Sequence, residues 1–292
     1  MAVAPVTYGA STRAPRGDYS EAHDDYTCDQ HWERYTPDEH AMYARMFARQ
    51  VKQARGQASD EFIDSLGRLG AADQIPRFDA ISESLTRATG WEVVAVPGLI
   101  PESAFFSLLA NRRFPVTVWL RAPAEFDYIV EPDVFHDLYG HVPLLFNPVF
   151  ADYMQAFGRG GLKAEELQAL EYLARLYWYT VEFGLIMSAS GLRVYGAGIL
   201  SSVGEMDYAL TSPVPQRLAF DLKRVLRTPY KIDHYQATYF VVDSFDQLFD
   251  ATAPDFSPLY AEIAGQPTLP LDTTLTGEKS YSPNANSAAA KS

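Results

Sequence analysis

The chain has 292 residues, of which 47% are hydrophobic, and is long enough to bury a proper core, so its stability does not require a structural metal. Its 24 basic and 37 acidic residues give a formal net charge of −13, which argues against a nucleic acid or an anionic membrane surface as the main partner. A single cysteine, Cys28, and the lack of an apolar run of about 18 residues predict a cytoplasmic protein without internal disulfides or membrane spans.

Both ends of the chain lack helical or strand periodicity. Residues 1–30 mix Ala, Pro, Gly and Asp, and residues 266–292 are small, polar and almost free of aromatic side chains. Such segments bury little apolar surface, so we predict a disordered N-terminal segment and a flexible C-terminal tail. Residues 31–265 show no domain boundary and are predicted to form one folded domain.

A capping box predicts the first helix, at about 37–55. Thr36 can cap it, and Pro37 suits its first position. Glu39, three residues after the cap, completes the box. The pattern then predicts two shorter helices and two strands rich in β-branched and aromatic residues, at about 59–67, 79–89, 91–96 and 114–120.

The longest apolar pattern predicts one helix over about 164–190, whose second half is apolar on nearly every side and is expected to lie at the centre of the molecule. The Gly-rich stretch at 195–205 is interpreted as a tight turn, because Ser201 stands where a dinucleotide-binding motif needs its third glycine. Three further helices and a short strand are predicted, at about 215–227, 244–252, 256–264 and 239–242. The predicted fold class is mainly α, with packed helices and a few short β-strands.

Three ionisable residues lie in apolar surroundings. His136 and His141 occur in FHDLYGHVPLLF, and Glu182 lies in WYTVEFGLIM without a basic residue three or four positions away. A buried carboxylate is costly unless it is paired or bound to a metal. Two imidazoles and one carboxylate form the ligand set of non-haem ferrous oxygenases, which leaves open coordination positions, although zinc accepts the same ligands. The residues therefore predict a metal site and leave iron and zinc open.

The five-residue step between the two histidines excludes a thermolysin-like zinc motif. That motif places its second His four residues after the first, with Glu beside the first, whereas Gly140 and Asp137 occupy these positions. On a regular α-helix, side chains five residues apart point about 140° away from each other. We therefore expect the helix to break at Gly140, and Pro143 to keep it from resuming.

Five motifs occur in the order of a known family and span about half of the chain. They are VPGLIPESAFF, EPDVFHDLYGHVPLLF, YWYTVEFGL, YGAGILSSVGE and YFVVDSF. With them the chain resembles the pterin-dependent aromatic amino acid hydroxylases, and among these the short bacterial phenylalanine hydroxylases. The resemblance implies the catalytic-domain fold of that family for residues 31–265.

The resemblance also implies the reaction and its cofactors. Ferrous iron would be held by His136, His141 and Glu182, with a tetrahydropterin as two-electron donor and molecular oxygen as oxidant. The expected activity is conversion of L-phenylalanine to L-tyrosine. The chain lacks the additional segments of the larger animal enzymes, so a monomer is expected, with a pterin-recycling dehydratase as the partner protein that the chemistry allows.

Further residues match the family's contacts with pterin and substrate. Phe105 matches the ring that stacks on the pterin, and Arg121 the arginine that holds the amino acid carboxylate. The implied pterin contacts are Gly98, Leu99, Phe105 and Asp137. The implied substrate contacts are Arg121, Pro132, Trp178 and Ser201, of which Pro132 and Trp178 pack around the ring and Ser201 places a hydroxyl near the first ligand.

Three alternatives stay open at this level. The first is a tyrosine or tryptophan hydroxylase of the same family. Ile232, near the position where tyrosine hydroxylases place an acidic group, favours phenylalanine, although Asp233 adjoins it. The second is a zinc-dependent hydrolase that uses the same three ligands with Asp137 as base. The third is a helical binding protein with a structural metal.

Overall fold

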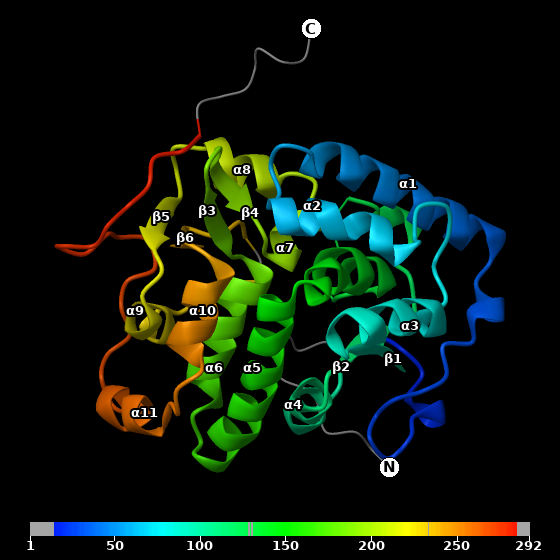
Figure 1. Ribbon diagram of the computed structural model, residues 1–292, viewed down its shortest axis with the longest axis horizontal. Helices are drawn as coiled ribbons and strands as arrows, with labels where there is room; N and C mark the ends of the chain where they lie inside the picture. Colours follow the sequence, from blue (N-terminus) through cyan, green and yellow to red (C-terminus); the bar gives the residue numbers. More distant parts are fainter. Residues whose placement is uncertain (1–14, 128, 130, 233, 285–292) are drawn as a thin grey trace, which may run out of the picture.

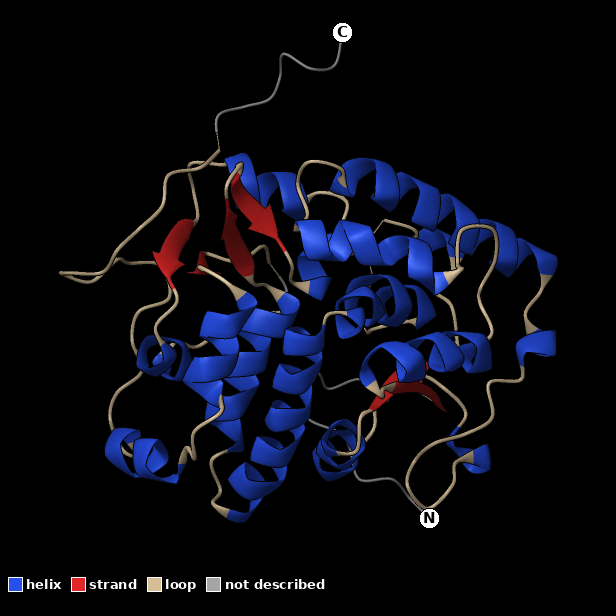
Figure 2. Cartoon of the chain, in the orientation of Figure 1, coloured by secondary structure: helices blue, strands red, loops and turns tan. Residues whose placement is uncertain are grey.

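Helices make up most of the regular structure in the computed structural model, which describes residues 15–127, 129, 131–232 and 234–284 (Figure 2). The α-helices are α1 (Pro37–Ala54), α2 (Asp60–Leu66), α3 (Phe78–Thr89), α4 (Glu102–Ala110), α5 (Pro148–Glu166), α6 (Leu170–Tyr177), α7 (Ala197–Leu200), α8 (Glu205–Thr211), α9 (Leu222–Arg227), α10 (Phe245–Thr252) and α11 (Ser257–Ile263). The strands are β1 (Glu92–Val96), β2 (Arg113–Thr117), β3 (Leu185–Ser188), β4 (Gly191–Val194), β5 (Gln216–Ala219) and β6 (Thr238–Val242). The predicted mainly α fold class is confirmed.

Two small sheets accompany the helices. β1 and β2 pair in parallel and are connected through α4. The second sheet has the order β4-β3-β6-β5, with β3 antiparallel to β4 and parallel to β6. In Figure 1, α5 and α6 run side by side, with the β1–β2 pair to one side and the larger sheet to the other. The described part of the chain shares one main apolar core, to which α1, α5 and β6 all contribute buried side chains.

The start of α1 has the geometry that the sequence predicts. The Thr36 hydroxyl accepts a hydrogen bond from the Glu39 backbone N–H, and the Glu39 carboxylate accepts one from the Thr36 backbone N–H at 2.7 Å. Each bond satisfies a backbone donor that the first helical turn leaves unpaired. The helix then buries Tyr43 and Met46 against the core.

The single helix predicted over 164–190 is wrong. In the structure α5 ends inside this range at Glu166, and α6, a π-helical turn at Trp178–Glu182 and β3 follow. Asn147 caps α5 by accepting from the N–H groups of Val149 and Phe150, a start signal that the apolar pattern alone does not show. Between α5 and α6 the chain turns at Gln168, which has φ 54°. An apolar run does not distinguish one buried helix from two helices and a strand.

The helix predicted over 215–227 is wrong in its first half. Gln216–Ala219 forms β5, paired in parallel with Thr238–Val241 of β6, and α9 starts only after Asp221 caps it. These four residues have no strong strand propensity of their own, and the pairing with β6 determines their conformation.

Residues 266–284 run along α9 and then along the second sheet to α8. The N–H of Ala219 donates to the carbonyl of Lys279, that of Tyr281 to Arg217, and that of Asn284 to Leu210. The predicted division into segments 1–30, 31–265 and 266–292 stays a prediction, and residues 285–292 lie outside the described part. None of the described helices combines the length and the hydropathy of a membrane-spanning segment.

Candidate metal centre

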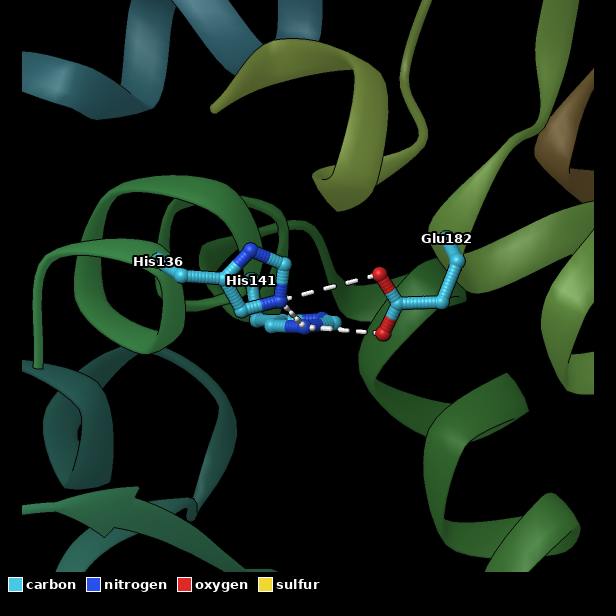
Figure 3. A group of neighbouring side chains, drawn as sticks. All are labelled: His136, His141 and Glu182. Carbon is cyan, nitrogen blue, oxygen red and sulfur yellow. Dashed lines mark hydrogen bonds and ion pairs between the residues drawn. The ribbon is translucent and has the colours of Figure 1, made fainter. Parts of the chain in front are cut away.

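His136, His141 and Glu182 point their donor atoms toward one another from two segments of the chain, with Glu182 41 residues after His141 (Figure 3). His141 Nε2 lies 3.2 Å from Glu182 Oε1, and His136 Nε2 lies 3.6 Å from Glu182 Oε2. The two Nε2 atoms are 3.2 Å apart. All three side chains are largely shielded from solvent, since their exposed fractions are 14%, 5% and 14%. The sequence-predicted ligand set is therefore assembled in space.

Both segments that supply ligands are π-helical turns, His136–His141 and Trp178–Glu182. The expected break at Gly140 does not occur. A π-helix bonds residue i to residue i+5, so two side chains five apart come to the same face without interruption of the helix. The chain then continues as a 3₁₀-helix, Val142–Phe146, that contains Pro143 in its first turn, so the proline does not end it.

Gly140 is required for close packing rather than for a break. A Cβ at this position would lie 2.9 Å from the Cβ of Ala197 and 3.0 Å from its carbonyl oxygen. Ala197 begins α7, the helix that leads to Ser201. The glycine therefore lets the His136–His141 turn and α7 touch.

We expect Gly140→Ala to lower the free energy of unfolding by about 1–3 kcal/mol, the usual cost of overpacking a tight site. Urea denaturation measures it. Gly160→Ala is the matched control, because Gly160 lies in α5 and a Cβ added there would have no heavy atom within 4 Å, so alanine should stabilise by roughly 0.4–1 kcal/mol. Equal effects of the two substitutions would contradict the packing role.

The donor set fits a divalent metal ion. Ligand bonds of about 2.1 Å at near-right angles place donor atoms roughly 3 Å apart, close to the observed 3.2–3.6 Å. The Ser201 hydroxyl donates to the carbonyl of Ala197 at 2.9 Å and lies 2.8 Å from His136 Nδ1. With its one proton used, this hydroxyl accepts from Nδ1–H, which leaves the lone pair of His136 on Nε2, the atom that faces the other ligands.

The protonation states of His136 and Glu182 also suit metal binding. Burial lowers the pKa of His136 to about 4, so its imidazole is neutral at pH 7, as a ligand must be. Burial alone would raise the pKa of Glu182, but the charge of His141 and a hydrogen bond from it outweigh this effect and keep the pKa below its usual value. Glu182 is therefore an ionised acceptor. Burial lowers the pKa of His141, but the charge of Glu182 outweighs this effect and raises the pKa, so a metal ion must displace a proton from His141.

Asp137 is one of the four pterin-contact candidates. It is adjacent to His136 and 7% exposed. Its carboxylate accepts a hydrogen bond from the backbone N–H of Thr117, the last residue of β2, at 2.8 Å. Burial raises its pKa to about 7. The carboxylate thus lies between the π-helical turn His136–His141 and the β1–β2 pair.

The other pterin-contact candidates lie on the β1–α4 connection and on α4. A Cβ on Gly98 would lie 2.4 Å from the carbonyl oxygen of Arg16, and Leu99 accepts a hydrogen bond from the Tyr19 hydroxyl at 2.9 Å, so residues 16–19 pack directly on this loop. The Phe105 ring contacts the Tyr177 ring edge-on at 5.8 Å. Tyr177 in turn lies 6.3 Å from the His141 ring, which brings α4 next to the metal centre.

Arg121, a substrate-contact candidate, is 4% exposed and forms a two-point ion pair with Asp133. Its Nε donates to Asp133 Oδ2 at 2.8 Å and its Nη2 to Oδ1 at 2.9 Å. Asp133 also accepts from the backbone N–H of His136. The pair therefore connects Arg121 to the first ligand, and Nη1 makes no hydrogen bond within the described residues.

Trp178 and Pro132 complete the substrate-contact candidates. Trp178 begins the π-helical turn that ends at Glu182, and its ring stacks on that of Tyr230 at 4.4 Å. Pro132 is partly buried and directly precedes Asp133. Both therefore lie within a few residues of a metal ligand or its supporting ion pair.

Sequence reasoning missed two supports of the site. Asp133 lies three residues before His136 but between two further acidic residues, Glu131 and Asp137, so it lacked the apolar surroundings that identified Glu182. Gln236, which accepts a hydrogen bond from the Trp178 indole N–H at 2.9 Å, had no such signal, because it lies 58 residues away.

A further buried carboxylate, Glu205, lies outside the metal centre. It is 5% exposed and forms no ion pair among the described residues. Burial raises its pKa from 4.5 to about 7, although hydrogen bonds from Tyr239 and Gln236 oppose this. Between these two pH values the unfolded chain ionises at this position while the folded protein keeps the proton.

Stability should therefore fall as the pH rises from 4.5 to about 7 through the Glu205 contribution. Each pH unit of this window costs up to about 1.4 kcal/mol. Urea unfolding of the protein and of Glu205→Gln at several pH values isolates the effect, because the substitution removes only this proton equilibrium. The unfolding free energy of the variant should fall less steeply over this range, and parallel pH profiles would show that Glu205 titrates normally.

Comparison with known proteins gives one consistent answer. A family model described as biopterin-dependent aromatic amino acid hydroxylase matches residues 11–254. The phenylalanine-4-hydroxylase of Ralstonia nicotianae is 52% identical over 296 residues, covering 95% of each chain. That of Chromobacterium violaceum is 59% identical over 241 residues, covering 82% of this chain and 81% of the relative. A crystal structure of the Chromobacterium violaceum enzyme with iron and phenylalanine bound has a TM-score of 0.85 at 54% identity, covering 89% of this chain and 96% of that chain.

Proposed function

The chain belongs to the biopterin-dependent aromatic amino acid hydroxylases, and we propose on that basis that it hydroxylates L-phenylalanine to L-tyrosine with molecular oxygen. The observation that carries the proposal is the meeting of His136, His141 and Glu182. It occurs in a chain that matches, over most of its length, an enzyme crystallised with iron and phenylalanine. Non-haem iron and a tetrahydropterin are the cofactors, which makes the protein a pterin-dependent monooxygenase.

Iron and pterin supply the activation of oxygen that an aromatic ring needs for hydroxylation. His136, His141 and Glu182 would hold the iron, and a set of two histidines and one carboxylate would leave it coordination positions for the reactants. Ser201 sets which nitrogen of His136 carries the proton and thereby orients the imidazole. The polypeptide thus fixes the metal and leaves space for the reactants.

We assign the amino acid carboxylate of the substrate to Arg121. Its guanidinium is held rigidly by Asp133, and Nη1 is not used in that pair. A buried, pre-oriented guanidinium is well suited to a carboxylate. We propose that the ring of the substrate lies beside Pro132 and Trp178. The Ser201 hydroxyl would then lie at the edge of the same pocket.

We assign the pterin to the side of the centre formed by Gly98, Leu99, Phe105 and Asp137. Phe105 offers a ring face beside Tyr177, and aromatic rings stack on planar heterocycles. Asp137 supplies a buried carboxyl that can hydrogen-bond a pterin nitrogen. Aromatic side chains around the ligands also exclude water, which protects an oxidising reaction from side reactions.

Family membership decides between the alternatives that the ligand set left open. Iron replaces zinc as the expected metal, and a hydroxylase replaces a hydrolase or a structural metal protein. The relatives reported above are phenylalanine hydroxylases, which favours phenylalanine over tyrosine and tryptophan. Ile232 is partly buried, and the neighbouring Asp233 lies outside the described residues.

An activity assay tests the proposal. Purified protein with ferrous iron, a tetrahydropterin and phenylalanine should form tyrosine, detected by chromatography, and omission of any one component should stop product formation. Tyrosine and tryptophan, offered separately at the same concentration, should react more slowly. A protein with iron bound that forms no tyrosine would contradict the proposed reaction, and preferred hydroxylation of tryptophan or tyrosine would contradict the proposed substrate.

We also propose a cytoplasmic monomer with residues 31–265 as its catalytic domain. The single cysteine supports the cytoplasmic location, and the one main apolar core of the described residues supports a single catalytic domain. The net charge of −13 supports a small-molecule substrate rather than nucleic acid or a membrane as partner. A pterin-recycling dehydratase is the protein partner that the use of a pterin would call for.

A further inference from the structure

The orientation of Trp178 is fixed by one loop. Its indole contacts two aromatic rings, with Tyr230 stacked at 4.4 Å and an interplanar angle of 16°, and Phe183 at 4.7 Å. The indole N–H donates to the side-chain oxygen of Gln236 at 2.9 Å. Tyr230 and Gln236 both lie in the connection between α9 and β6. The position of Trp178 therefore depends on the position of that connection.

Gln236 is itself held in a single orientation. It is 4% exposed, and its side-chain nitrogen donates to the carbonyls of Lys231 and His234 at 3.2 and 3.3 Å. These two acceptors identify the nitrogen, so the oxygen must face Trp178. A displaced backbone at Gln236 would therefore move the acceptor of the indole N–H.

Glu205 holds the backbone at Gln236. One oxygen, Oε1, accepts from the Gln236 backbone N–H at 3.2 Å and from the Tyr239 hydroxyl at 2.8 Å. The nearby buried Arg217 is not its partner, because that guanidinium donates to four backbone carbonyls, those of Tyr208, Ala209, Ser212 and Pro215. Burying a carboxylate without a cation lowers the stability of the fold. The role of Glu205 must therefore lie in orienting the two groups that donate to it.

Glu205 also joins the two sides of the proposed substrate pocket. It begins α8 immediately after the segment that carries Ser201. The α9–β6 connection crosses this segment closely, since a Cβ on Gly204 would lie 2.2 Å from the Tyr235 hydroxyl. The hydrogen bonds of Glu205 thus link the Ser201 side to the Trp178 side.

We propose that Glu205 is a positioning residue for the aromatic ring of the substrate, which acts by holding Gln236 and, through it, Trp178. This inference rests on the proposed function and on the assignment of Trp178 to the substrate pocket. Glu205 touches neither the metal ligands nor the substrate in this arrangement. Its effect should therefore appear in the affinity for phenylalanine and not in the binding of iron or pterin.

The test compares Glu205→Ala with Glu205→Gln in the iron-loaded enzyme. Alanine removes the acceptor, and we expect both the KM and the calorimetric Kd for phenylalanine to rise about tenfold, the usual effect of losing one hydrogen bond. Iron affinity and the KM for the pterin should change less than about threefold. Glutamine keeps an acceptor oxygen at the same place, so its phenylalanine affinity should stay within about threefold of the parent enzyme.

Two further variants separate positioning from general stability. Gln236→Leu should reproduce the loss of phenylalanine affinity, and adding Glu205→Ala to it should cause no further loss, since both act through the same indole contact. Tyr239→Phe removes the other hydrogen bond of Glu205 and should change stability while leaving phenylalanine affinity intact. If Glu205→Ala does not fold, the inference still requires Gln236→Leu to lose phenylalanine affinity and Glu205→Gln to keep it.

Unchanged phenylalanine affinity in Glu205→Ala or in Gln236→Leu would overturn the inference, as would equal losses in Glu205→Gln and Glu205→Ala. Additive losses in the double variant would overturn it as well. If the parent enzyme forms no tyrosine, the proposed function fails instead. An active parent enzyme whose variants bind phenylalanine normally would refute only the role of Glu205.

Discussion

Replacing Glu182 with alanine will remove iron from the protein and with it the hydroxylase activity. The carboxylate is the only anionic ligand of the proposed set and comes from a different segment than the two histidines. Loss of a residue that merely supports a ligand costs roughly 10–100-fold in metal affinity, so loss of the ligand itself should cost more than about 100-fold. A competition titration with an iron chelator measures this affinity.

The fold should survive this substitution, because the histidines that face Glu182 can lose their protons and remain buried as neutral imidazoles, which an arginine cannot do. Circular dichroism and urea denaturation of the metal-free proteins check that point. Glu171→Ala is the control, since the Glu171 side chain on α6 is 63% exposed and its substitution should leave iron affinity unchanged. If Glu182→Ala keeps iron at the parent affinity, Glu182 is not a ligand.

Replacing Asp133 with alanine will destabilise the protein by about 3–5 kcal/mol, the cost of leaving one partner of a buried ion pair alone. The exposed side-chain fractions of Arg121 and Asp133 are 3% and 0%, so solvent cannot replace the lost partner. The substitution also leaves the backbone N–H groups of Arg121 and His136 without their acceptor. The affinity for phenylalanine should fall too, because the guanidinium loses its fixed orientation.

Urea denaturation and the KM for phenylalanine measure the two effects. Asp127→Ala is the matched control, because Asp127 pairs with Arg49 at 2.6 Å while its side chain is 79% exposed, and such pairs contribute about 0–1 kcal/mol. A loss below about 1 kcal/mol in Asp133→Ala would mean that the buried pair is not a main support of the site.

The sequence indicated the ligands because their chemistry conflicts with their surroundings. A histidine pair and an isolated glutamate in apolar stretches are visible without any structure, and the structure brings these three together. The capping box of α1 was equally visible, since its two hydrogen bonds join residues three apart. Features that depend on near neighbours in the chain were predicted well.

The features that the sequence did not reveal depend on distant contacts. The division of the apolar stretch 164–190 into α6, a π-helical turn and β3 depends on the pairing of β3 with β6, more than 50 residues later. The support of Trp178 by Gln236 and of Gln236 by Glu205 likewise joins separate segments. No local periodicity encodes such contacts, and only the resemblance to a family pointed toward Trp178 at all.

The π-helical turn at His136–His141 makes the metal centre sensitive to chain length as well as to side-chain identity. A turn of this kind contains one residue more than an α-helical turn, and the extra residue is what brings positions five apart to one face. Deletion of a single residue between the two histidines would allow an ordinary α-helix and rotate everything after it by about 100°. The spacing between these ligands is thus a constraint that no substitution can relax, and homologous enzymes should accept insertions and deletions in surface loops long before they accept one here.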